Sequence, residues 1–244
     1  MRNARGIGGV GMDGMYTKTR TGGRMPGGGI SRRPLHVIIL ADCSGSMTGE
    51  KIEALNFAIG QMVQHLSAWE EEQERAQILV RAIAFATEPR WHIHEPIPVV
   101  GLRWSALAVV PQGRTNMGPA FQMAASVLGT DQMPRRAFSP VLLLITDGLP
   151  SDAQADFDAG LNAIMSRRAG HDALRMAVAI GKDARSEALK RFIADPKVPV
   201  LVAGQADQIT DQLRLVTLAV TGAWSFAGDQ NERSLAVDDP DRPV

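Results

Sequence analysis

Residues 35–46 read LHVIILADCSGS, an apolar run that ends on one carboxylate and two hydroxyl side chains. The run of Leu, Val, Ile and Ala is typical of a buried strand. Asp42, Ser44 and Ser46 follow it at alternate positions. Oxygen atoms of Asp and Ser suit a hard divalent cation such as Mg²⁺, which binds few protein carboxylates and keeps several waters. The stretch therefore predicts a cation site at the end of a buried strand.

Three ligands on one loop fill only half of the coordination positions of an octahedral cation, and two later segments offer more oxygen ligands. Thr115 lies in the loop QGRTNMG at residues 112–118, and Asp147 ends a second hydrophobic run, VLLLITD at residues 141–147. In an open α/β sheet, ligand sites form beyond the carboxyl ends of the strands. We therefore expect these loops to meet at one edge of the sheet.

Hydrophobic patterning along the chain alternates between strand and helix periods. Pro96 and Pro98 mark one predicted strand as peripheral, because proline cannot donate to a central ladder. The alternation predicts a doubly wound, mostly parallel α/β sheet with helices on both faces. We expect strands at 35–41, 77–86, 91–99, 141–147, 174–180 and 198–203, and helices at 49–74, 117–128, 152–168, 186–194 and 206–220.

The three motifs, in this order, resemble the metal-ion-dependent adhesion site of von Willebrand factor type A domains. Residues 42–54 and 146–152 look closest to the TerY-like bacterial branch of that family. The resemblance implies a type A domain over residues 34–224, with a Mg²⁺ site that also admits Mn²⁺ or Ca²⁺. In such a site an Asp or Glu of a protein partner completes the coordination. The implied ligands are Asp42, Ser44, Ser46, Thr115 and Asp147.

The function that this resemblance implies is a binding module, not an enzyme. TerY-like proteins are associated with a Ser/Thr kinase, a metal-dependent protein phosphatase and tellurite-resistance-type stress responses. The alternative is an adaptor or cochaperone of a MoxR- or chelatase-type AAA+ ATPase. Catalysis is disfavoured because the sequence contains no P-loop, no Gly-x-Ser-x-Gly elbow and no obvious general base beside the site.

Length and composition favour one domain with tails over two small domains. The chain has 244 residues, 45% of them hydrophobic, and a formal net charge of zero, so bulk charge predicts neither nucleic-acid nor membrane binding. The single cysteine excludes an intramolecular disulfide and favours a reducing, cytoplasmic setting. No apolar run has the length of a membrane span, and the amino terminus lacks the pattern of a signal peptide.

The two ends of the chain have the composition of disordered segments. Residues 1–33 are rich in Gly and carry seven Arg or Lys against one Asp, about six positive charges, which leaves about six negative charges for the remainder. This leader is either a flexible extension or a docking arm whose Thr17, Thr19 and Thr21 are phosphorylated. Residues 225–244 form a predicted acidic, disordered tail.

Other polar residues have simpler interpretations beside the functional ones. Cys43 is expected to be a small core residue rather than a redox centre. His92 and His94 have the alternate spacing of zinc ligands, but a solvated edge strand is favoured. The acidic run at residues 70–74, which Arg75 ends, is predicted to be a solvated helix face and helix end, with a partner surface as the alternative. We expect Asp42→Ala to abolish cation binding without unfolding the protein, because Asp42 is predicted to lie on a surface loop.

The remaining histidines are scattered along the sequence. His36, His65 and His171 share no spacing with one another or with the predicted site, so we expect them to be packing or surface residues.

Overall fold

The computed structural model describes residues 32–129, 131–181 and 187–235, with side chains as far as Gly222. The predictions for residues 1–31 and 236–244, including the disorder of the leader and of the tail end, lie outside these residues. Six strands form one sheet in the order β3-β2-β1-β4-β5-β6. The strands are β1 (Arg33–Asp42), β2 (Ala76–Phe85), β3 (Pro89–Pro98), β4 (Val141–Thr146), β5 (Leu174–Ile180) and β6 (Leu201–Ala203).

All neighbouring strands are parallel except β3, which runs antiparallel to β2 at one edge of the sheet. The helices between them cross from one strand to the next, as parallel pairing requires. This arrangement confirms the predicted α/β fold and the peripheral place of the proline-containing strand. The α-helices are α1 (Glu50–Glu71), α2 (Met117–Ser126), α3 (Gln154–Met165), α4 (Arg168–His171), α5 (Glu187–Ile193) and α6 (Ile209–Leu235).

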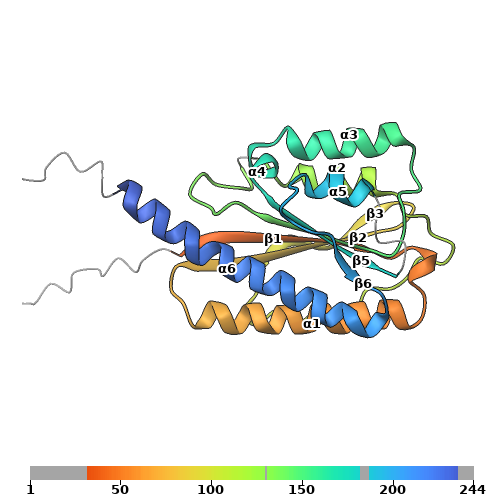
Figure 1. The fold of residues 1–244 in the computed structure, drawn as a ribbon, viewed down its shortest axis with the longest axis horizontal. Coiled ribbons are helices and arrows are strands. Elements are labelled where there is room, and N and C mark those ends of the chain that lie inside the picture. Colours follow the sequence, from red (N-terminus) through yellow and green to blue (C-terminus); the bar gives the residue numbers. More distant parts are fainter. Residues whose placement is uncertain (1–31, 130, 182–186, 236–244) are drawn as a thin grey trace, which may run out of the picture. The chain divides into compact units, whose positions relative to one another are not determined.

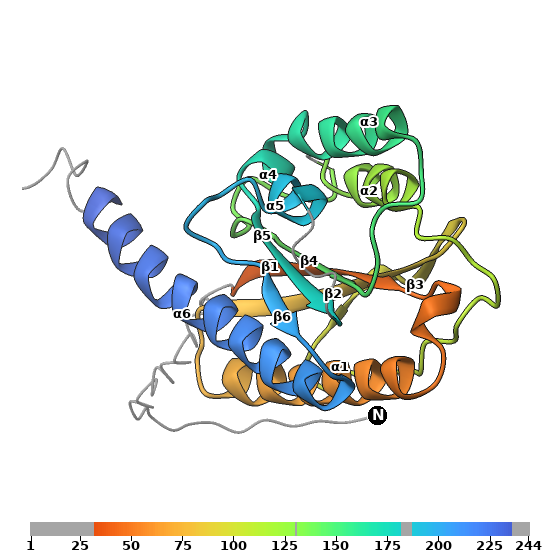
Figure 2. The same cartoon turned by 45° about the vertical axis from the view of Figure 1, so that its right-hand side comes forward.

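Helices cover both faces of the sheet. Helices α1 and α6 pack against each other on one face, and α2, α3 and α5 lie over the other (Figure 1). A view turned by 45° shows the same layers (Figure 2). Two separate hydrophobic cores fill the spaces between helices and sheet.

Strand β1 contributes to both cores because its side chains alternate between the faces. Val37, Ile39 and Ala41 belong to the core under α1 and α6. Ile38 and Leu40 belong to the core under α2, α3 and α5. All five side chains are at most 1% exposed. Strand β1 thus packs against the helix layers on both faces of the sheet and carries the predicted cation motif at its carboxyl end.

Several element boundaries differ from the predicted ones. The helix predicted at 152–168 is divided into α3 and the short α4. Strand β6 is shorter than the predicted 198–203, because Pro199 has no N–H to donate to a ladder. Helix α6 continues beyond residue 220 to Leu235.

The interpretation of residues 70–74 as a wholly solvated face is wrong at its first residue. The side chain of Glu70 is 3% exposed. Its Oε2 accepts a hydrogen bond from the backbone N–H of Ile78 at 2.6 Å, and its Oε1 pairs with Arg32 at 3.4 Å. A buried carboxylate is tolerated when it is hydrogen-bonded and paired in this way. Glu70 therefore ties the end of α1 to the start of β2.

Candidate metal centre

Asp42, the last residue of β1, is a buried carboxylate and not the surface-loop group that the sequence led us to expect. Its Oδ1 accepts the backbone N–H of Ser44 at 2.8 Å, and its Oδ2 accepts the hydroxyl of Thr146 at 2.6 Å. Burial raises the pKa of Asp42, and these hydrogen bonds oppose the rise. The carboxylate is therefore held in a fixed orientation at an electrostatic cost that a nearby cation would reduce.

A chain of hydroxyls joins the loop after β1 to the loop after β4. The Oγ atoms of Ser44 and Ser46 are 3.0 Å apart, and Ser46 donates to Oδ1 of Asp147 at 2.7 Å. These three residues and Asp42 lie together, although more than a hundred positions separate Asp42 from Asp147. The predicted convergence of the two strand ends is thus present.

Gly45 allows the first loop to approach the loop that carries Thr115. Its N–H donates to the carbonyl of Gly113 at 3.0 Å. A Cβ at Gly45 would lie 3.1 Å from the backbone nitrogen of Gln112, tighter than ordinary contact. Only a residue without a side chain fits here without displacing the backbone of the neighbouring loop.

Thr115 lies beside the loop of Asp147. A Cβ placed on Gly148 would be 3.4 Å from Oγ1 of Thr115, so the hydroxyl adjoins the residue after Asp147. Ser151 fixes the Thr115 backbone: its N–H donates to the Thr115 carbonyl at 2.8 Å, and its Oγ accepts the Thr115 N–H at 3.3 Å. All five predicted ligands therefore lie at the carboxyl edge, Asp42 at the end of β1 and the other four in three adjoining loops.

Three residues that support these loops were missed as supports by the sequence analysis. Thr146 orients Asp42, and Asp152 accepts the N–H groups of Met117 and Gly118 at the start of α2, at 3.3 and 2.6 Å. Lys51, in the first turn of α1, approaches Oδ2 of Asp147 to 2.5 Å. Thr146 and Asp152 lie in the quoted 146–152 segment, so their proximity in sequence was the available signal. Lys51 lies in the quoted 42–54 segment, but nothing in that segment indicates its contact with Asp147.

The structure places the alternative candidates elsewhere in the fold. Cys43 is 1% exposed, and burial raises the pKa of its thiol to about 11, which confirms a packing residue and disfavours redox chemistry. His92 bonds to Ser105, and the exposed His94 pairs with Glu95 at 3.3 Å. Within the described part of the chain, no three His, Cys, Asp or Glu residues are grouped as metal ligands.

The other histidines are packing or surface residues, as their burial shows. His36 is a buried residue whose Nδ1 lies 3.3 Å from a guanidinium nitrogen of Arg81, so it is a packing residue. His65 and His171 are exposed.

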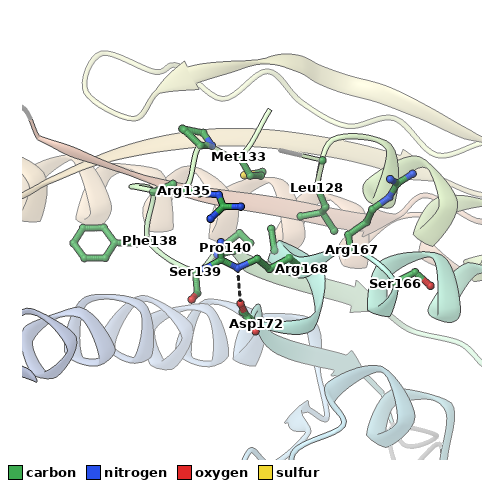
Figure 3. Close-up of a pocket in the computed structure, with 14 residues that line it drawn as sticks. Leu128, Met133, Arg135, Phe138, Ser139, Pro140, Ser166, Arg167, Arg168 and Asp172 are labelled. Atoms are coloured by element: carbon green, nitrogen blue, oxygen red, sulfur yellow. Dashed lines mark ion pairs between the residues drawn. The ribbon is translucent and has the colours of Figure 1, made fainter. Parts of the chain in front are cut away.

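A hollow of about 300 Å³ lies at the opposite, amino end of the sheet. Figure 3 shows Arg135, Arg167 and Arg168 around it, with Arg168 paired to Asp172 at 3.8 Å. All three arginines are exposed. The hollow shares no residue with the loops that hold Asp42 and so belongs to a different region of the protein.

The donor set at the carboxyl edge fits a hard cation. It offers two carboxylates and three neutral hydroxyls, with neither sulfur nor imidazole among them. Oxygen-only sets of this kind suit Mg²⁺, Mn²⁺ and Ca²⁺ better than soft metals. The ammonium group of Lys51 against Asp147 shows that positive charge is accommodated at this position.

None of the helices in the described ranges is long and apolar enough to span a membrane.

Solved structures share this fold at low sequence identity. One is a von Willebrand factor type A protein from Catenulispora acidiphila, with 18% identity, a TM-score of 0.59, and coverage of 78% of this chain and 43% of that one. Another is the von Willebrand factor domain of the type V pili tip protein Mfa5 from Porphyromonas gingivalis, with 10% identity, a TM-score of 0.59, and coverage of 79% and 96%.

A third similar structure is proximal thread matrix protein 1 from the mussel byssus, solved with a zinc-occupied metal-ion-dependent adhesion site. It is 14% identical, with a TM-score of 0.56 and coverage of 78% of this chain and 48% of that one. The chain thus spans less than half the length of two of these three proteins. It matches no curated protein sequence.

The family itself is shown by the sequence match. The model of the von Willebrand factor type A domain matches residues 36–214, which include most of β1, all of β2 to β6 and all five candidate ligands. The chain belongs to the von Willebrand factor type A domain family.

Proposed function

We propose that the carboxyl-edge site binds Mg²⁺ and that the bound cation holds a carboxylate of a protein partner. The observation that carries the proposal is the hydroxyl of Ser46, which contacts both Ser44 and Asp147 and so joins two loops into one oxygen-rich site. Asp42 and Asp147 would supply the negative charge, and Ser44, Ser46 and Thr115 the neutral oxygens. Mn²⁺ and Ca²⁺ are the alternative cations for such oxygens.

The division between charged and neutral ligands explains why a partner would supply the last carboxylate. Two Asp side chains neutralise a dication, and hydroxyls add no further charge. A cation held in this way keeps enough Lewis acidity to attract an outside Asp or Glu. The zinc-occupied adhesion site in proximal thread matrix protein 1 supports divalent-cation binding by the fold. It does not select the metal for this chain.

We further propose an adaptor role without catalysis. The polar groups next to Asp42 are hydroxyls and a backbone N–H, and the adjoining Lys51 is engaged with Asp147, so the surroundings offer no free general base. The TerY-like resemblance supports a cytoplasmic signalling role beside a Ser/Thr kinase and a metal-dependent phosphatase. An AAA+ ATPase of the MoxR or chelatase type is the alternative partner.

Isothermal titration of Mg²⁺ into wild type and Asp42→Asn tests the cation site. The variant keeps the shape of the side chain but loses its charge, and we expect its affinity to fall by at least about 100-fold, the upper end of what loss of a group that only orients a metal ligand causes. Asp172→Ala, which removes an exposed carboxylate at the opposite end of the sheet, is the matched control and should bind as wild type does. Equal affinity in Asp42→Asn and wild type would overturn the site.

Affinity capture from native lysate, in Mg²⁺ and again in EDTA, tests the partner. Retention of a kinase or phosphatase only in Mg²⁺, and its loss with Asp42→Asn, would support the signalling role. Retention of an AAA+ ATPase under the same conditions would favour the alternative. Capture of the same partners in EDTA would exclude a cation-mediated contact.

A further inference from the structure

Lys51 is an internal cation directed at the candidate metal centre. Gly49, with a φ of 80°, turns the chain into α1, and Lys51 then lies in the first turn of that helix. Its Nζ is 2.5 Å from Oδ2 of Asp147 and 3.2 Å from the carbonyl of Ser46. The Asp147 side chain is completely buried, whereas that of Lys51 is 38% exposed. The Lys51 side chain can therefore move away into solvent, whereas the Asp147 side chain is held in place by the surrounding atoms.

The contact places Lys51 in competition with any other cation for the same oxygen atoms. Asp147 presents Oδ1 to Ser46 and Oδ2 to Lys51, so both of its oxygens are occupied by donors. A divalent cation that binds Asp147 directly must displace the ammonium group or share the carboxylate with it. In both cases the positive charge of Lys51 opposes the second positive charge, and at such short range in a partly buried site this repulsion is weakly screened.

A count of formal charges shows what the lysine changes. Asp42, Asp147 and Lys51 together carry one negative charge. With a dication added, the group carries one positive charge, which a single outside carboxylate neutralises. Without Lys51, the two carboxylates alone would neutralise the dication. Two charged groups of the adjoining loops, Arg114 and Asp152, have opposite signs and are each engaged by backbone groups, Arg114 by the Ser151 carbonyl and Asp152 by the start of α2. Arg90 acts electrostatically on the neighbouring Cys43 in all variants alike.

We propose that Lys51 couples the binding of the divalent cation to the binding of the partner's carboxylate. The inference rests on the cation site proposed above. Lys51 weakens the binding of the cation alone, and the excess positive charge of the loaded site strengthens the binding of a carboxylate. By thermodynamic linkage, the carboxylate increases the cation affinity by the same factor. The site is then filled chiefly when cation and partner are both present.

A purely structural ion pair is the competing explanation, and substitutions of Lys51 separate the two. Lys51→Met keeps an unbranched apolar stem but removes the charge, and Lys51→Arg keeps the charge. The measurements are isothermal titration of Mg²⁺ in chloride and in acetate at equal ionic strength, with acetate as the carboxylate probe. Thermal unfolding in EDTA provides a readout that does not depend on the metal.

We expect Lys51→Met to bind Mg²⁺ in chloride about tenfold more tightly than wild type, and Lys51→Arg to resemble wild type. Acetate should raise the Mg²⁺ affinity of wild type by about five- to tenfold, the lower part of the usual range of coupling between two ligands, and that of Lys51→Met by less than about twofold. In EDTA, Lys51→Met should melt at a lower temperature than wild type, because Asp147 then lies buried without its counter-ion.

The outcomes separate this inference from the function on which it rests. If wild type binds Mg²⁺ and Lys51→Met binds it equally or less tightly, Lys51 does not compete with the cation and the inference is overturned alone. If neither protein binds Mg²⁺, the proposed cation site is overturned and the coupling falls with it. A melting temperature in EDTA that is unchanged in Lys51→Met would show that Lys51 is not the counter-ion of Asp147, and would overturn the inference independently of metal binding.

Discussion

The carboxyl and amino ends of the sheet both carry polar side chains, but they hold them in different ways. At the carboxyl end, the buried side chains of Asp42 and Asp147 accept hydrogen bonds from hydroxyls of other segments, Thr146 at the end of β4 and Ser46 in the loop after β1. At the amino end, exposed arginines surround a hollow of about 300 Å³, and one of them, Arg168, forms a long ion pair with Asp172. Functional groups need partners that fix their orientation. Buried polar side chains that are hydrogen-bonded to one another therefore indicate a candidate binding site better than the volume of a hollow does.

Apart from substitution of a predicted ligand itself, the largest effect is expected at the hydroxyl that orients Asp42. Thr146→Val keeps the side-chain shape but removes the donor to Oδ2 of Asp42. We expect a loss of Mg²⁺ affinity of about 10- to 100-fold, as for other side chains that orient a metal ligand by a hydrogen bond. The buried carboxylate oxygen left without a donor should also lower the free energy of unfolding by about 1–3 kcal/mol. Isothermal titration and urea unfolding measure the two quantities.

Two further variants control for this result. Thr146→Ser retains the hydroxyl and should bind Mg²⁺ as wild type does. Thr217→Val removes a buried hydroxyl of α6, which bonds to the carbonyl of Leu213, and should leave the affinity unchanged. Wild-type affinity in Thr146→Val would show that Asp42 does not need this hydroxyl.

A smaller effect, of pH on stability, is expected nearer the amino end of β1. His36 is buried and accepts a hydrogen bond at Nδ1 from Arg81 at 3.3 Å. Burial, and then the charge of Arg81, lower the pKa of His36 from 6.5 to about 4. The unfolded chain then binds the proton more readily, so stability is fully present above pH 6.5 and is lost as the pH falls toward 4. Integration gives a loss of about 2 kcal/mol between pH 7.5 and 5.

Urea unfolding at the two pH values tests this effect. His36→Asn keeps an acceptor for Arg81 but does not titrate, so its stability should fall by about 2 kcal/mol less than that of wild type over this interval. His65→Asn, at an exposed position of α1, should behave as wild type does. The raised pKa of Asp42 acts in the opposite direction, favouring the folded state as pH falls, and is common to all three proteins. Parallel pH profiles in His36→Asn and wild type would contradict the assignment to His36.

The smallest effect is expected at the amino-end hollow. Arg135 is exposed and lines the hollow from a loop. Arg135→Ala should change the free energy of unfolding by no more than about 0.5 kcal/mol, as is usual for surface positions. Mg²⁺ affinity should not change at all. A loss of stability above about 1 kcal/mol, measured by urea unfolding, would show that the two ends differ less than their hydrogen bonds indicate.

Much of the fold could be predicted because the period of hydrophobic residues and the place of prolines are local signals. The runs before Asp42 and Asp147 predict strands, and parallel pairing then brings the two carboxylates to one edge. Thr115 was found through the family motif. That these residues bind a cation stays a prediction, which the titrations above test.

Other features could not be predicted because they depend on contacts between distant segments. The burial of Asp42 follows from the packing of loops around it, which its position after a strand does not reveal. Lys51 meets Asp147 across 96 positions of sequence, and Glu70 accepts the N–H of Ile78 only because α1 turns back onto β2. The shortness of β6 follows from Pro199, whose effect the apolar pattern concealed.

The alternation of β1 between two cores has a consequence for how this gene can diverge. Substitutions that keep the size and polarity of Val37 or Ile38 change one core at a time. An inserted or deleted codon within β1 would exchange the residues of the two cores and displace Asp42 from its partners in the same step. The strand is therefore expected to tolerate drift in sequence but not in length. Among structures that share this fold at 10–18% identity, insertions and deletions are accordingly expected outside the central strand.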